Sequence, residues 1–144
     1  SRVMSAIRIE EVAEPFIYKR AIKHMNSDRV IILTSGSGNP FSTTDTAAAL
    51  RARELDCDLI IKATKVDGIY DKDPAKYPDA KKYDYLTYKE AIRQELEVMD
   101  MTAFTMCQES NIPIIVCDIL GENNLQKIVE GEKIGTYVNG KNVE

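Results

Sequence analysis

The chain has 144 residues, with 19 basic and 23 acidic side chains and a formal net charge of −4. This length is typical of one domain with a real hydrophobic core, and the slight acidity argues against non-specific binding to nucleic acid or anionic membranes. No apolar run approaches the roughly 20 residues that span a bilayer. We therefore expect a single domain over residues 1–144, with neither nucleic acid nor membrane as partner.

The predicted elements alternate between helix and strand. A helix over 10–25 is followed by an aliphatic strand over 30–33, an alanine-rich helix over 46–55 and a strand over 59–61. After a polar loop over 64–85 come a helix starting at Thr87, a helix over 99–109, a strand over 112–117, a short helix over 125–129 and an edge strand over 136–138. Continuous β-branched runs are typical of parallel strands covered on both faces. The order predicts an α/β fold with a mainly parallel sheet and helices on its faces.

The three cysteines and single histidine are too few and too dispersed for a disulfide framework, a zinc site or a histidine-based triad. Cys107 and Cys117 have apolar neighbours, which predicts buried, unreactive thiols in a reducing compartment. His24 follows Lys23 on a predicted helix and is expected to be a solvated surface residue. The N-terminal Ser1–Met4 segment lacks the apolar stretch of a secretory signal.

The loop over 34–45 is the strongest candidate site, because it follows a strand and opens a helix. Gly36 and Gly38 permit close backbone approach, and hydroxyl and amide side chains crowd the turn. The turn is either a phosphate-binding loop or an ordinary capped helix start. It matches neither the Walker pattern nor the dinucleotide fingerprint. Asp45 at its end either handles a metal ion, orients cationic groups or simply caps the helix.

A second candidate surface follows the strand over 59–61. Lys62 can point at a phosphate, Tyr70 can stack on a base, and Asp73 can accept a hydrogen bond from a ribose or base; the alternative is a solvated polar loop. Asp100 opens the helix over 99–109, either as its N-cap or as a second acid facing the site. Thr87 and Glu90 have the spacing of a capping box.

Four blocks of the chain resemble, in order and in spacing, those of the bacterial uridylate (UMP) kinases of the amino acid kinase superfamily. Gly36–Ala52 is similar to GTGNPFFTTDSAAALRA, Lys62–Tyr70 to KATKVDGVF, Val98–Phe104 to VMDLAAF and Gly131–Thr136 to GEKxGT. The resemblance implies the amino acid kinase fold, a three-layer α/β/α sandwich with a mainly parallel sheet. It also implies transfer of the γ-phosphoryl group of Mg-ATP to UMP, giving UDP and ADP for pyrimidine nucleotide biosynthesis.

The resemblance assigns roles to three groups of residues. Asp45 would organise the cationic groups around the transferred phosphoryl, and Asp100 would be the second active-site acid. The UMP site would be formed by Ser37, Gly38, Asn39, Pro40, Phe41, Ser42, Thr43 and Thr44. ATP, with its Mg²⁺, would be bound by Lys62, Thr64, Tyr70 and Asp73, and no residue is assigned as a metal ligand. An aspartate at position 100 favours the UMP branch, because relatives acting on carboxylates carry a lysine there.

The chain departs from the family pattern in three ways. Ser37 and Ser42 stand where the family has threonine and phenylalanine. Nothing matches the family's opening strand, its Lys-x-Ser-Gly loop for the ATP phosphates or its Gly-Gly-Gly segment. Ser1 therefore corresponds to a position midway through the family's chain, and the N-terminal part of the fold is expected to be missing. We expect an incomplete enzyme that binds nucleotide weakly, with an exposed sheet edge and uncovered apolar surface.

Three alternatives stay open. The chain can be another kinase of this fold, acting on carbamate, aspartate or glutamate; a non-catalytic nucleotide-binding module; or, with least support, a Rossmann-type dehydrogenase domain. The family is typically a cytoplasmic homohexamer regulated by GTP and UTP. The resemblance thus implies a cytoplasmic homo-oligomer with UMP and ATP as ligands and GTP or UTP as effectors. Arg29 lies where some relatives place an allosteric contact, or it is an exposed loop arginine.

Overall fold

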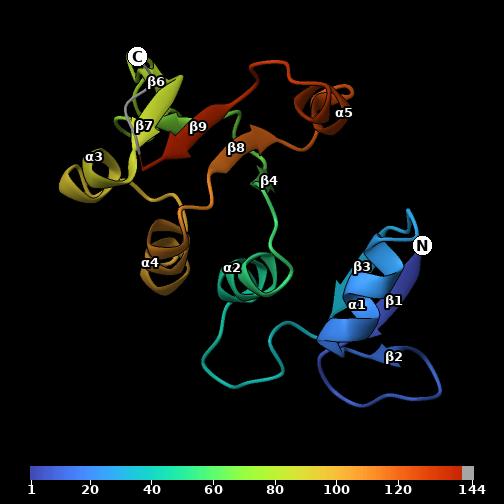
Figure 1. The fold of residues 1–144 in the computed structure, drawn as a ribbon. Coiled ribbons are helices and arrows are strands. Elements are labelled where there is room, and N and C mark those ends of the chain that lie inside the picture. The colour runs from blue at the N-terminus through green and yellow to red at the C-terminus, as the bar shows by residue number, and fades with distance from the viewer. Residues whose placement is uncertain (141–144) are drawn as a thin grey trace.

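The computed structural model describes residues 1–140 (Figure 1). Its N-terminal part is a parallel sheet of order β2-β1-β3, made of β1 (Arg2–Ser5), β2 (Glu14–Pro15) and β3 (Ile31–Thr34). The helix α1 (Tyr18–Met25) packs beside it, and Met4 and Ala21 are fully buried at their contact. This small cluster is the core of the N-terminal sheet.

The larger sheet has the order β4-β8-β9-β7. Its strands are β4 (Ile60–Thr64), β8 (Ile114–Asp118), β9 (Thr136–Asn139) and β7 (Tyr85–Thr87). The pairs β4–β8 and β7–β9 are parallel, and only β8–β9 is antiparallel. A separate two-stranded ribbon joins β5 (Ile69–Tyr70) and β6 (Lys82–Tyr83). The sheets are mainly parallel, which confirms the α/β class.

Helices cover both faces of the larger sheet. They are α2 (Thr44–Glu54), α3 (Tyr88–Arg93), α4 (Met101–Ser110) and α5 (Asn124–Val129). Successive side chains of a strand point to opposite faces. Ile114 and Val116 of β8 pack in one buried cluster with Phe104 of α4, whereas Ile115 shares a cavity lining with Ile128 of α5. Helix, sheet and helix therefore form three layers.

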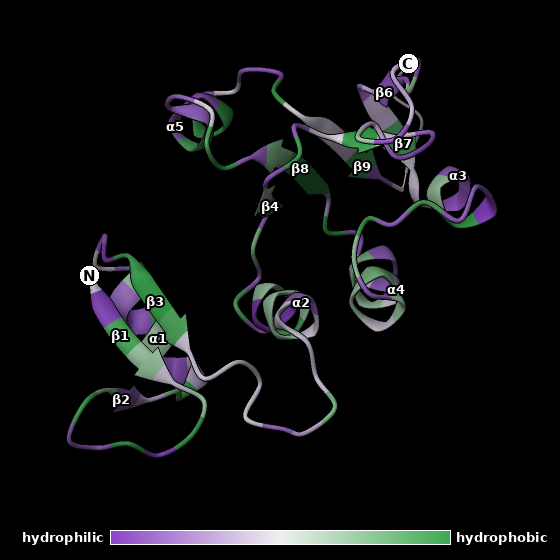
Figure 2. Ribbon diagram, turned by 180° about the vertical axis from the view of Figure 1, so that it is seen from behind, coloured by the Kyte–Doolittle hydropathy of each residue, from purple (hydrophilic) through white to green (hydrophobic). Residues whose placement is uncertain are grey.

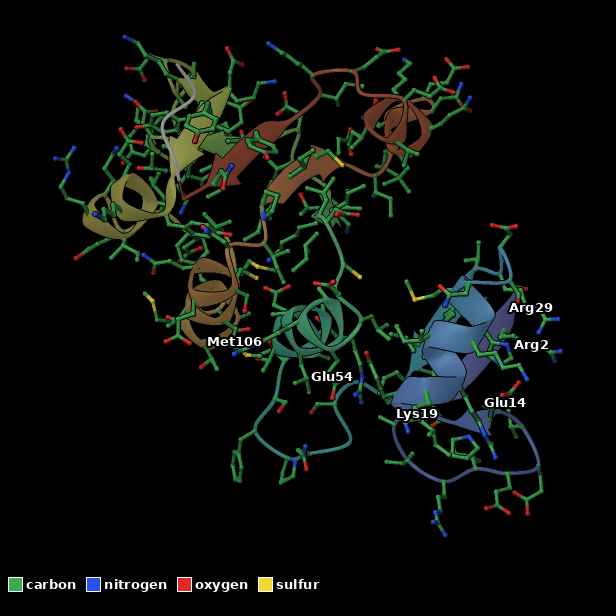
Figure 3. The ribbon with its side chains drawn as sticks, in the orientation of Figure 1. Arg2, Glu14, Lys19, Arg29, Glu54 and Met106 are labelled. Atoms are coloured by element: carbon green, nitrogen blue, oxygen red, sulfur yellow. The ribbon has the colours of Figure 1, made fainter. Side chains whose placement is uncertain are left out.

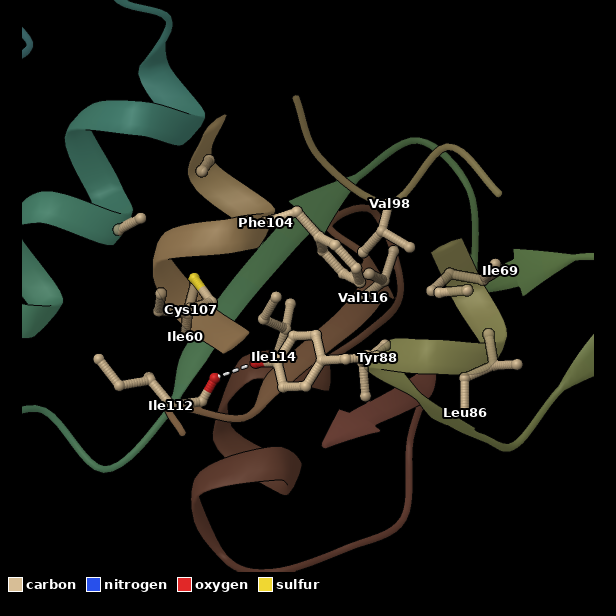
Figure 4. Packing of buried hydrophobic residues seen from close by; sticks show 14 of the residues in the cluster. Ile60, Ile69, Leu86, Tyr88, Val98, Phe104, Cys107, Ile112, Ile114 and Val116 are labelled. Carbon is tan, nitrogen blue, oxygen red and sulfur yellow. Dashed lines mark hydrogen bonds between the residues drawn. The ribbon is translucent and has the colours of Figure 1, made fainter. Parts of the chain in front are cut away.

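The main core lies between β7, β8, β9 and the helices α3 and α4 (Figure 4). The rings of Tyr88 and Phe104 meet edge to face, with centroids 5.0 Å apart. The hydroxyl of Tyr88 donates a hydrogen bond to the carbonyl of Ile112, so its one polar atom is satisfied. Burial raises the pKa of Tyr88 well above its ordinary value, which keeps this donor protonated. The pair fixes α3 and α4 against the sheet.

The two sheets are joined mainly through α2. Leu55, at the C-cap of α2, belongs to the same buried cluster as Met4 and Ala21. The guanidinium carbon of Arg51 lies 3.8 Å from the centre of the Phe16 ring, while its Nη1 lies 2.5 Å from Glu54 Oε2. The cluster that connects the two sheets has fewer buried residues than the main core.

The first predicted helix and the last predicted strand are wrong in placement. The helix expected over 10–25 begins only at Tyr18, because Pro15 lies in β2, paired with β1. The strand expected at an edge is β9, which lies between β8 and β7. Both errors arise because sheet pairing is non-local. The capping box at Thr87 and Glu90 is confirmed, with both hydrogen bonds present.

The expectation of a solvated His24 is also wrong. Its side chain is only 12% exposed, and its Nε2 lies 3.2 Å from Glu14 Oε2. Its Nδ1 lies 3.1 Å from Arg29 Nη1. Arg2 adds a longer contact of 3.8 Å to Glu14 (Figure 3, where Arg2, Glu14 and Arg29 are labelled). The histidine hydrogen bond lowers the pKa of Glu14. This polar cluster ties α1 to β2.

The strand β3 has both hydrophobic composition and an exposed position. Figure 2 shows β3 among the most hydrophobic elements, yet it lies at the edge of its sheet. Ile32 is 47% exposed and Leu33 37%, so the run is not covered on both faces as its sequence predicts. The exposed edge expected from the family resemblance is present. None of the helices within residues 1–140 is long and apolar enough to cross a membrane.

Candidate functional site

The N-termini of α2 and α4 open beside each other. Thr43 is the N-cap of α2: its extended backbone lets Oγ1 accept a hydrogen bond from the Thr46 amide at 3.1 Å. Asp100 caps α4 in the same way, and its Oδ1 accepts from the Ala103 amide at 3.0 Å. Because α2 and α4 pack against each other, the two caps come into contact. Thr43, the N-cap of α2, thus lies beside the carboxylate of Asp100, the N-cap of α4.

Hydroxyl groups of α2 hold the Asp100 carboxylate. Thr43 Oγ1 donates to Asp100 Oδ2, and Thr46 Oγ1 lies 3.2 Å from the same oxygen. Burial acts to raise the pKa of Asp100, but the hydrogen bonds from Thr43, the Ala103 amide and Thr46 outweigh it, so the pKa is lowered. The carboxylate is therefore ionised and oriented at neutral pH. Thr46 is a contributor that the sequence reasoning missed.

Asp45 and Lys62 form an ion pair beside this network. Lys62 Nζ on β4 lies 2.6 Å from Asp45 Oδ2 in the first turn of α2, with side chains 26% and 23% exposed. The Asp100 amide lies 3.4 Å from the same Asp45 oxygen. The two acids expected to be catalytic therefore belong to one network. An aspartate that orients a lysine is one of the roles considered for Asp45 from the sequence.

The loop expected to form the UMP site follows β3. Gly38 has φ +76°, and a Cβ there would lie 3.1 Å from the Ala6 carbonyl oxygen, so the turn needs a glycine. Ser37 Oγ accepts from the Asn39 amide at 3.2 Å, which stiffens the turn. All the other residues of the expected site are exposed: Gly38, Asn39, Pro40, Phe41, Ser42, Thr43 and Thr44.

Only one end of this loop contacts the acids. Thr43 touches Asp100 directly, and Thr44 is the first residue of α2. Phe41 is fully exposed and has φ +61°, a conformation in which side chains are uncommon. The structure thus joins the threonine end of the loop to the acidic network and leaves the Gly-Asn-Pro-Phe part in solvent.

All four residues expected to bind ATP line one cavity of about 580 Å³. They are Lys62, Thr64, Tyr70 and Asp73. The strand β4 supplies the first two, and the loop and ribbon after it supply the others. Lys62 is shared between the cavity and the pair with Asp45. The cavity thus adjoins the acidic network.

Hydrogen bonds fix the orientation of the cavity's polar side chains. The Tyr70 hydroxyl donates to Asp67 Oδ1 at 2.7 Å, and this bond raises the pKa of Tyr70 and lowers that of Asp67. Asp73 Oδ1 accepts from the Ala75 amide at 3.0 Å, and its Oδ2 lies 3.3 Å from Lys76 Nζ. Tyr70 therefore presents a neutral aromatic ring to the cavity.

The sequence reasoning missed part of the lining. Residues 94–98 close one side of the cavity, and Lys72 and Lys76 add positive charge. The two lysines had a signal, since they lie near Asp73 in the same loop. Residues 94–97 follow α3 and belong to none of the motif blocks, whereas Val98 opens the third block. A second cavity, of about 670 Å³, lies between α5 and the larger sheet. None of the expected site residues lines it.

The site does not form a protein cage for a metal ion. Among residues 1–140, no group of three histidine, cysteine or carboxylate ligands converges. Asp45 is paired with Lys62, and Asp100 accepts hydrogen bonds from α2 and α4. Magnesium usually binds through substrate phosphates and few carboxylates.

Comparison with known sequences identifies the family of this chain. The sequence model described as "Amino acid kinase family" matches residues 4–118, which include β4, the glycine loop and both acids. The chain belongs to the amino acid kinase family. The dehydrogenase alternative is thereby removed.

Similar proteins are named as uridylate or UMP kinases. The protein named "Uridylate kinase PUMPKIN, chloroplastic" of Arabidopsis thaliana is 50% identical over 140 residues, which are 97% of this chain and 41% of the relative. The UMP kinase structure from Bacillus anthracis matches with TM-score 0.94 and 36% identity, over 98% of this chain and 58% of that one.

Two further solved structures extend the comparison. The UMP kinase from Ureaplasma parvum matches with TM-score 0.91 and 35% identity, over 96% of this chain and 60% of that one. The uridylate kinase from Archaeoglobus fulgidus matches with TM-score 0.68 and 31% identity, over 86% of this chain and 58% of that one. The chain thus spans roughly 40–60% of the length of these relatives.

Proposed function

We propose that this chain is the nucleotide-binding portion of a UMP kinase, which transfers the γ-phosphoryl group of Mg-ATP to UMP and forms UDP and ADP. One observation carries the proposal: the four residues expected to bind ATP line a single cavity, whose Lys62 is paired with Asp45 at the end of the expected UMP loop. The names of the relatives, all uridylate or UMP kinases, support the same substrate.

The proposed mechanism relies on positioning and charge. Phosphoryl transfer has a loose transition state, so catalysis comes mainly from alignment and electrostatic stabilisation. Lys62 would neutralise charge on the transferred group, and Asp45 holds its ammonium in place at 2.6 Å. A phosphate oxygen of UMP is itself the nucleophile, so no general base is needed. Asp100 remains ionised and keeps the N-terminus of α4 oriented toward the site.

The first experiment measures ADP release by the 144-residue chain with Mg-ATP and UMP. In any active preparation, Asp45→Asn should lower turnover by about 10²-fold or more, because the lysine loses its partner. Asp58→Asn, an exposed change on the loop before β4, is the matched control and should have no effect. A panel with carbamate, aspartate and glutamate as acceptors tests the other branches of the family.

Binding without turnover is the second candidate for this chain. It is favoured by the 58–60% coverage of the solved relatives, since the Lys-x-Ser-Gly loop implied by the resemblance has no match here. Mg-ATP should then shift the amide signals of Thr64, Tyr70 and Asp73 without releasing ADP. If ATP leaves these signals unchanged, the nucleotide-binding proposal itself is wrong. Turnover equal to that of a whole family member would contradict the expectation of an incomplete enzyme.

Assembly, regulation and location stay predictions from the resemblance. We propose a homo-oligomer, hexameric as in the family, that responds to GTP or UTP. Arg29, one candidate for an effector contact, lies beside His24. Cytoplasmic residence also stays a prediction, and the Arabidopsis relative is named as chloroplastic.

A further inference from the structure

The segment over residues 94–98 is a wall of the proposed nucleotide cavity that has no assigned role. It begins at Gln94, the C-cap of α3, and leads to Asp100, the N-cap of α4. The Asp100 amide lies 3.4 Å from Asp45 Oδ2, the oxygen that also accepts from Lys62. The far end of this segment therefore lies at the residues proposed to act on the phosphates.

The near end of the segment lies at the ribbon formed by β5 and β6. The Tyr83 hydroxyl on β6 donates to Gln94 Oε1 at 2.6 Å. Within the ribbon Tyr83 pairs with Ile69, the residue before Tyr70. Tyr70 is the residue expected to stack on a base. Since the acidic network marks the phosphate end of the cavity, Gln94 lies at the end where a base would bind.

The backbone around Gln94 is fixed by the way α3 ends. The Glu95 amide donates to the Ile92 carbonyl at 3.1 Å, and the Leu96 amide donates to the Ala91 carbonyl at 3.0 Å. Glu95 has φ +52° between these bonds, so the turn is a Schellman motif. Leu96 packs against the main core. The Gln94 side chain therefore starts from a well-defined turn.

The hydrogen bond from Tyr83 determines which end of the Gln94 carboxamide is free. Its oxygen accepts from the Tyr83 hydroxyl, which leaves the two N–H donors of Nε2 for another partner. No side-chain or backbone acceptor within residues 1–140 takes a hydrogen bond from this nitrogen. Gln94 is exposed, so the donors are accessible, and the Tyr83 ring is held because it packs against the main core.

The rest of this lining is suited to a flat, uncharged group. Buried members of the main core supply its apolar part: Ile69, Val98 and Val116 (Figure 4). Tyr70 adds an aromatic ring, and aromatic and apolar side chains are the usual surroundings of a stacked base.

Charge excludes a phosphate from the same end. Glu95 and Glu97 follow Gln94 and line the cavity with it, and their carboxylates repel an anion. A ring nitrogen of a purine is an uncharged acceptor, and it is the group that the free N–H donors of Gln94 match.

We propose that Gln94 recognises the base of the phosphate donor by donating a hydrogen bond from Nε2 to a ring nitrogen of the purine. Tyr83 is the positioning residue, because its hydroxyl holds the carboxamide with the nitrogen free. This inference rests on the proposed function, since it requires a nucleotide in the cavity, but it needs binding only and not turnover. It gives a specificity role to a residue outside the motif blocks.

Binding of ATP analogues to the 144-residue chain tests the inference. The probes are the magnesium complexes of ATP and of its 1-deaza, 3-deaza and 7-deaza analogues, in each of which one ring nitrogen is replaced by C–H. The amide signals of Thr64 and Tyr70 report binding by NMR. One analogue should bind about fivefold more weakly than ATP, because it loses the hydrogen bond from Gln94. That analogue identifies the nitrogen.

Two variants of Gln94 separate this hydrogen bond from other contacts. Gln94→Met keeps the length of the side chain without an N–H, so ATP and the weakened analogue should bind equally. Gln94→Glu still accepts from Tyr83 but offers a second acceptor oxygen in place of the donor, so ATP should bind about tenfold more weakly. Arg93→Met changes the preceding exposed residue, which does not line the cavity, and should retain the difference.

Tyr83→Phe tests the positioning role. The phenylalanine ring keeps the packing against the core but lacks the hydroxyl, so the carboxamide is free to turn over. The difference between ATP and the weakened analogue should shrink, although Gln94 is still present. A difference of unchanged size would show that Tyr83 does not position Gln94.

Two results would overturn the recognition by Gln94 alone. They are equal affinity of the wild-type chain for all four nucleotides, and a difference that persists in Gln94→Met. Both leave nucleotide binding itself intact. If ATP shifts neither the Thr64 nor the Tyr70 signal, the proposed function is wrong and the inference is wrong with it, so the two failures are distinguishable.

Discussion

Thr43 combines structural and site roles in one side chain. Its Oγ1 accepts the Thr46 amide and thereby starts α2, and the same hydroxyl donates to Asp100. The resemblance also assigns this residue to UMP. A phosphate bound there would have to share or replace the bond to Asp100, so acceptor binding and the state of the second acid are linked in the proposed scheme.

Thr46 allows this network to be tested without disturbing the cap. Thr46→Val removes the hydroxyl but keeps the amide that bonds Thr43, so the pKa of Asp100 should rise toward its ordinary value of 3.8. Carboxyl carbon NMR over a pH titration measures the change. Thr46→Ser restores the donor and should return the lowered pKa. An unchanged pKa in the valine variant would show that Thr46 contributes nothing to it.

Glu14 gives a pH-dependent prediction at the same scale. Its folded-state pKa lies below 4.5, mainly because of the His24 hydrogen bond, so the unfolded chain binds more protons as the pH falls. The stabilisation from Glu14 is present above pH 4.5 and is lost as the pH drops through the folded pKa. In denaturant titrations at successive pH values, the free energy of unfolding of Glu14→Gln should lack this pH-dependent contribution. Glu11→Gln, in the preceding turn, is the control and should retain it.

At the scale of elements, α3 depends on a local signal. Thr87 and Glu90 exchange both capping-box hydrogen bonds, and the backbone bond from Thr87 lowers the pKa of Glu90. Thr87→Ala should therefore destabilise the chain by about 1 kcal/mol in chemical denaturation. Thr105→Ala, on the exposed face of α4, is the matched control and should be neutral or slightly stabilising. Equal effects of the two changes would contradict the capping role.

Local patterns explain which elements could be predicted from the sequence. The capping box from Thr87 to Glu90 spans four residues, and the aliphatic runs of β3, β4 and β8 are contiguous, so each is recognisable alone. The two-residue strand β2 is not, because it exists only through pairing with β1. Likewise, the place of β9 between two strands follows from partners about 20 and 50 residues away.

The candidate site likewise has residues that local patterns predict and contacts that they do not. The motif blocks identified Lys62, Thr64, Tyr70 and Asp73, which the structure brings to one cavity. The Lys62–Asp45 pair and the Thr46–Asp100 contact join residues 17 and 54 positions apart. Such contacts depend on how α2 packs against β4 and α4, and no local pattern encodes them.

At the scale of the whole molecule, the two sheets have unequal cores. The N-terminal sheet has the small cluster around Met4, Ala21 and Leu55, whereas the larger sheet has the extended cluster around Tyr88 and Phe104. Regions with few buried apolar contacts open at lower free energy. Amides in β1 that bond to β3 should therefore exchange faster than those in β8 and β9.

Leu55→Ala tests this prediction directly, because Leu55, at the C-cap of α2, is buried in the smaller cluster. The change should destabilise the N-terminal sheet by about 2–5 kcal/mol and speed its amide exchange, while β8 and β9 keep their rates. Exchange measured residue by residue by NMR gives both numbers. A uniform increase across both sheets would show that the chain opens as one unit.

The placement of the glycine loop after β3 and of the ATP cavity after β4 has an evolutionary consequence. In the proposed scheme, the residues that bind the phosphate acceptor follow β3, and those that bind the phosphate donor lie on and after β4, which belongs to the other sheet. The two groups are connected by α2 and by the Lys62–Asp45 pair. Substitutions in the loop can alter the acceptor without disturbing the donor cavity. A lineage with this architecture can diversify its substrates while inheriting the same use of ATP.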